Sequence, residues 1–104
     1  MSESASPTPD RVAEAVAGTT KLIEEIQAQF PAFAYSPLPR VYAEQLQTCI
    51  HEYVAVLRAI GTTPERTLKE VKSLIARATT GRDVYPNHLL MNVAVMWAIE
   101  EYYR

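Results

Sequence analysis

The sequence predicts an all-α fold, a small bundle of three to four helices with a proline-rich linker after the first helix. Apolar residues recur at spacings of three and four along most of the chain, which is the period of one helix face. Strand-like alternation of apolar and polar residues between hairpin turns does not occur. With 104 residues, of which 48% are hydrophobic, the chain is long enough for a single domain with its own core.

The N-terminal part of the chain divides into a tail and a helix. The segment 1–8 is rich in serine and proline and lacks apolar periodicity, so we expect a disordered tail there. Thr8 and Pro9 then form a helix start signal, an N-cap hydroxyl followed by a proline at the first helical position. An apolar stripe predicts an amphipathic helix over 9–30. Its members are Val12, Val16, Thr19, Ile23, Ile26 and Phe30.

Two further helices are expected after a linker. Three prolines within 31–39 prevent a continuous helix and predict a proline-rich linker. Residues 40–60 carry a broad apolar face and form the second predicted helix, with Gly61 as its left-handed cap. Thr63, with the proline after it, repeats the helix start signal, and the third predicted helix ends at Gly81.

The last predicted helix is apolar on every side. Ten of the eleven residues in 89–99 are apolar, whereas a surface helix normally shows one apolar stripe. We therefore expect this helix to be either the central element of the bundle or half of an interface. Residues 40–104 are predicted to form a three-helix unit, with the helix over 9–30 packed across it or onto a partner.

Patterns typical of catalysis and metal binding are missing from the sequence. Cys49 is the only cysteine, and its place on the apolar face of the second helix favours an unreactive thiol with a raised pKa. His51 and His88 lack a second histidine at metal-ligand spacing, and there is no glycine-rich phosphate loop. We therefore expect no enzyme activity, no catalytic residue, no metal and no cofactor.

Protein binding is the function that the sequence favours. The last helix offers Met96 and Trp97, which are adaptable or anchoring contact residues, and Tyr103 follows them. Asn92 is the one polar residue in 89–99, and a lone amide at such a position can fix the register of a helix pair. We predict a non-catalytic interaction module, either a regulatory or adaptor protein or a subunit of a larger assembly. Its partner would be a second copy, giving a homodimer, or another helical protein.

Nucleic-acid binding is the alternative interpretation. Residues 50–78 have the outline of a helix-turn-helix, with the third helix as the recognition element. Four basic residues of that helix would contact phosphates, namely Arg66, Lys69, Lys72 and Arg77. Leu57 and Thr62 depart from the usual turn motif, and the chain as a whole carries a net charge of −2. These two features favour a protein partner over DNA.

The expected location is the cytoplasm. The N-terminal residues show no positively charged and apolar secretory signal pattern. No apolar run reaches the roughly 18 to 20 residues that a helix needs to cross a bilayer, so we expect no membrane span.

Overall fold

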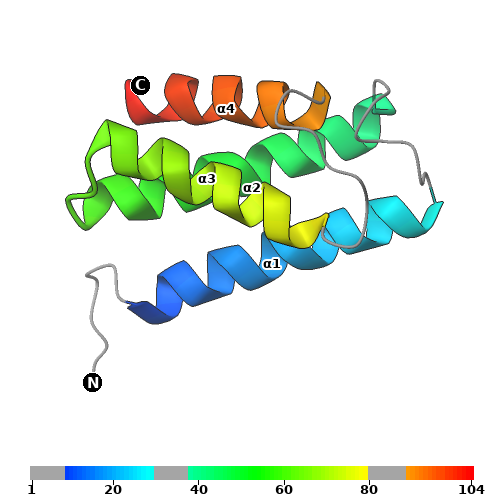
Figure 1. The fold of residues 1–104 in the computed structure, drawn as a ribbon, viewed down its shortest axis with the longest axis horizontal. Helices are drawn as coiled ribbons and strands as arrows, with labels where there is room; N and C mark the ends of the chain where they lie inside the picture. The colour runs from blue at the N-terminus through cyan, green and yellow to red at the C-terminus, as the bar shows by residue number, and fades with distance from the viewer. Residues whose placement is uncertain (1–8, 30–37, 80–88) are drawn as a thin grey trace.

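The computed structural model describes residues 9–29, 38–79 and 89–104, which form four α-helices (Figure 1). They are α1 (Pro9–Gln29), α2 (Arg40–Ala59), α3 (Pro64–Ala78) and α4 (Leu89–Tyr102). The predicted all-α bundle is confirmed, with four helices. No strand occurs within the three described ranges, and no helix in them is long and apolar enough to cross a membrane.

Some sequence predictions lie outside the described residues. These are the tail over 1–8, most of the linker over 31–39, and the expected helix stop at Gly81. Within the described part, the last residue of α3 is Ala78, and Thr79 follows it as the C-cap.

The central position in the bundle belongs to α2, not to α4. Figure 1 shows α1 and α4 on opposite sides of the molecule, with α2 and α3 between them. Both α1 and α4 pack against α2 and α3. The predicted first helix therefore packs within the same chain, mainly on α2 and α3, and α4 is an outer helix that packs mainly on the same two helices.

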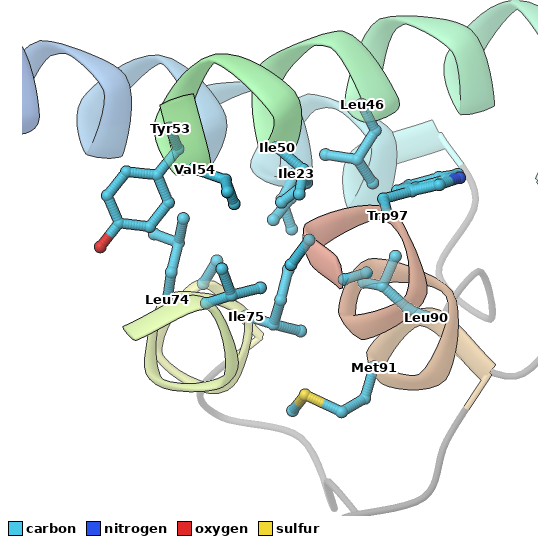
Figure 2. Close-up of a cluster of buried hydrophobic side chains, with 14 of the residues drawn as sticks. Ile23, Leu46, Ile50, Tyr53, Val54, Leu74, Ile75, Leu90, Met91 and Trp97 are labelled. Atoms are coloured by element: carbon cyan, nitrogen blue, oxygen red, sulfur yellow. The ribbon is translucent and has the colours of Figure 1, made fainter. Parts of the chain in front are cut away.

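The core is formed by apolar side chains from all four helices (Figure 2). Ile23 and Ile26 of α1 are fully buried against it, as the predicted stripe requires. Thr19, in the same stripe, is also buried, and its hydroxyl donates a hydrogen bond of 2.8 Å to the carbonyl oxygen of Ala15. The hydroxyl is therefore satisfied inside its own helix. Other core residues include Leu46, Ile50, Tyr53, Val54, Leu74, Ile75, Leu90, Met91 and Trp97.

The turn between α2 and α3 is a Schellman motif, which confirms the predicted cap at Gly61. Gly61 has a φ of +88°, in the left-handed region that glycine adopts without strain. Its N–H donates to the carbonyl oxygen of Arg58, and the N–H of Thr62 donates to that of Leu57, both at 3.0 Å. These two bonds satisfy carbonyl groups that the helix end would otherwise leave unpaired.

The start of α3 is capped as its sequence predicts. The Thr63 hydroxyl accepts a hydrogen bond of 3.2 Å from the backbone N–H of Arg66, and Pro64 occupies the first helical turn. This satisfies one of the free N–H groups at the helix start. The two caps together set where α2 ends and α3 begins, only a few residues apart.

The two glycines of the described helical region are expected to respond oppositely to substitution by alanine. At Gly61 an added Cβ meets no atom within 4 Å, but the positive φ is strained for any L side chain. Gly61→Ala should therefore lower the free energy of unfolding by about 1 to 2 kcal/mol. Gly18→Ala, inside α1 and also without a nearby atom, should raise it by about 1 kcal/mol. Urea unfolding followed by circular dichroism measures both, and changes of the same sign would contradict this account.

Candidate interaction surface

α4 is divided along its length into a buried side and an exposed apolar side. The buried side carries Leu90, Met91, Ala94, Trp97, Ala98 and Glu101. On the other side the exposed fraction is 38% for Leu89, 51% for Met96, 45% for Ile99 and 69% for Tyr103. The exposed Asn92 lies on the same side. We call Leu89, Asn92, Met96, Ile99 and Tyr103 the α4 seam.

The α4 seam has the spacing of a helix-pairing surface. Its members follow one another at intervals of three, four, three and four residues. This is the a/d pattern with which two helices interlock their side chains. Tyr103 follows the last helical residue, but its backbone N–H still bonds to the carbonyl oxygen of Ile99 at 3.2 Å. It therefore continues the line of the helix.

The predicted partner-binding residues fall on both sides of α4. Asn92, Met96 and Tyr103 lie on the seam, whereas Trp97 is 8% exposed and packs in the core. Figure 2 shows its indole among core side chains, near Leu46. Leu89 and Ile99 are not among the predicted contact residues, although the heptad positions counted outward from Met96 include both.

A groove adjoins the C-terminal end of the seam. It has a volume of about 260 Å³ and lies between the start of α3 and the end of α4. Leu68 of α3 and Ile99 and Tyr103 of α4 are among the side chains that line it. Because two of these residues also belong to the seam, the groove and the seam form one continuous surface.

The C-terminal end of α4 is held in place by hydrogen bonds to α2 and to the turn after it. The Tyr102 hydroxyl donates to the carbonyl oxygen of Thr62 at 2.6 Å. The Arg58 guanidinium donates through Nη1 to the carbonyl oxygens of Glu101 and Tyr102, at 3.1 and 3.0 Å. A cation at this end of a helix also interacts favourably with the helix dipole. The seam is therefore carried by an anchored helix.

Charged side chains between α2 and α4 lie beside the seam rather than on it. Glu101 is buried, and its carboxylate accepts a hydrogen bond of 2.8 Å from Nε of Arg104. His51 of α2 lies 3.9 Å from the Glu101 carboxylate and 4.0 Å from that of Glu100. Within the described residues, no three His, Cys, Asp or Glu side chains are grouped so that they could hold a metal ion.

Cys49 matches the prediction of a thiol with a raised pKa. It is half-buried in α2, and burial raises the pKa of the thiol above its usual value. The nearby Glu52 carboxylate raises this pKa further, whereas a hydrogen bond with Thr19 lowers it. The net shift is upward, so the thiolate is disfavoured at neutral pH.

The basic residues of the nucleic-acid alternative share their helix with acids. Arg66, Lys69, Lys72 and Arg77 are all exposed on α3. However, Arg66 is paired with Glu70 of the next turn, with Nε 2.9 Å from the carboxylate. Glu65 is also exposed on this helix. The outer face of α3 is thus a surface of mixed charge.

A larger hollow, of about 430 Å³, lies between α1 and α2. Its lining combines Ala15, Ala55 and other small apolar residues with the charged Arg11 and Glu52. Among the described residues that line it there is no cysteine, serine or histidine, so these residues do not pair a nucleophile with a base.

Comparisons with known proteins do not assign the chain to a family. The chain matches no protein-family model, and neither a curated protein nor a solved structure is significantly similar to it. The geometry of α4 and its neighbours is therefore what indicates a function for this chain.

Alkylation of Cys49 should be slow at neutral pH. Because the thiolate is the nucleophile, a raised pKa means that the rate keeps increasing above the pH at which an ordinary cysteine is fully reactive. Thr19→Val removes the hydrogen bond that lowers the pKa and should move the midpoint of the rate profile higher still. Mass spectrometry of iodoacetamide adducts over a pH series measures both proteins. A midpoint below that of a free cysteine would contradict the assignment.

The neighbours Trp97 and Met96 should differ strongly in their contribution to folding. Trp97→Ala leaves a cavity in the core and should lower the free energy of unfolding by about 3 to 5 kcal/mol. Met96→Ala alters an exposed side chain and should change it by no more than about 0.5 kcal/mol in the monomer. Urea unfolding at low protein concentration measures both values. Similar losses for the two variants would show that Met96 is also part of the core.

Proposed function

We propose that this protein is a non-catalytic helical interaction module that binds a partner through the α4 seam. The observation that carries the proposal is the line of four large, exposed apolar side chains along one side of α4. Contiguous apolar surface on a small protein is typical of an interaction site. Burying this surface against a partner contributes roughly 25 cal/mol of favourable free energy for each Å² of apolar surface removed from water.

A helix is the partner element that fits this surface best. The alternating intervals of three and four residues match the positions at which a second helix inserts its own side chains. Met96, near the middle of the line, is flexible and adapts to the shape of what it contacts. Tyr103, at the end, joins an apolar ring to a polar hydroxyl, which suits the rim of an interface.

The anchored position of α4 supports the same function. Because Arg58 and Tyr102 hold its C-terminal end on α2 and the following turn, the seam is arranged before a partner arrives. A surface that is already ordered loses less conformational entropy on binding. The module would serve as an adaptor, a regulatory protein or a subunit of an assembly. Its cytoplasmic location remains an expectation from the sequence.

Site-specific photo-crosslinking in cells that produce the protein tests this function. A photoreactive amino acid at Met96 should yield an adduct of discrete mass, because this position faces the partner. The matched control is Val41, an exposed apolar residue of α2 that is not on the seam. The same probe at Val41 should yield none. Absence of an adduct at Met96, or equal adducts at both positions, would overturn the proposal.

A second variant checks that the seam itself forms the contact that gives the photo-adduct. Ile99→Glu places a carboxylate among the apolar contacts, and burying it there without a partner charge is costly. The adduct yield at Met96 should fall by at least about tenfold, which corresponds to roughly 1.4 kcal/mol. Val41→Glu introduces the same charge elsewhere and should leave the yield unchanged.

A further inference from the structure

We draw no further inference here: the strongest candidate, the exposed apolar side of α4 with the groove that adjoins it between α3 and α4, carries nothing beyond the proposed function, because nothing in the described part of the structure shows what covers it.

Discussion

One constraint governs this fold: α4 is apolar on every side, but among the described helices it packs mainly against α2 and α3. Packing against α2 and α3 buries the side that carries Trp97, and the opposite side with Met96 is left in solvent. These two residues are adjacent in sequence, so the helical turn alone divides them between core and surface. The core, the seam and the expected association all follow from how many helices cover α4. If α4 lay at the centre of the bundle, its neighbours would bury the seam as well.

The short connection between α2 and α3 determines what lies beside the seam. Gly61 reverses the chain within a few residues. The backbone of Thr62, which follows it, forms hydrogen bonds with both α2 and α4. Its N–H completes the cap of α2, while its carbonyl oxygen accepts the hydroxyl of Tyr102 at the end of α4. The start of α3 is thereby brought next to the end of α4, where the groove forms. A local turn motif thus shapes the candidate interaction surface.

The sequence predicts the parts of this structure that depend on local signals. The cap at Gly61, the N-cap at Thr63 and the raised pKa of Cys49 follow from residue type and position along one helix. The division of α4 could not be predicted in that way, because a helix that is apolar all round has no stripe to mark its buried side. Which side Trp97 faces depends on the positions of α2 and α3, which are contacts distant in sequence.

Folding of the monomer offers no reason for the apolar residues of the seam. Met96 and Ile99 are about half exposed, so polar replacements there would cost the bundle little. The outer face of α3 shows the alternative, since its exposed positions include Lys69 and Lys72, which water solvates well. A line of apolar side chains along an outer helix instead lowers the solubility of the monomer and favours its association with other molecules. The proposed interaction function therefore accounts for the apolar chemistry of the seam, which the packing of the four helices does not.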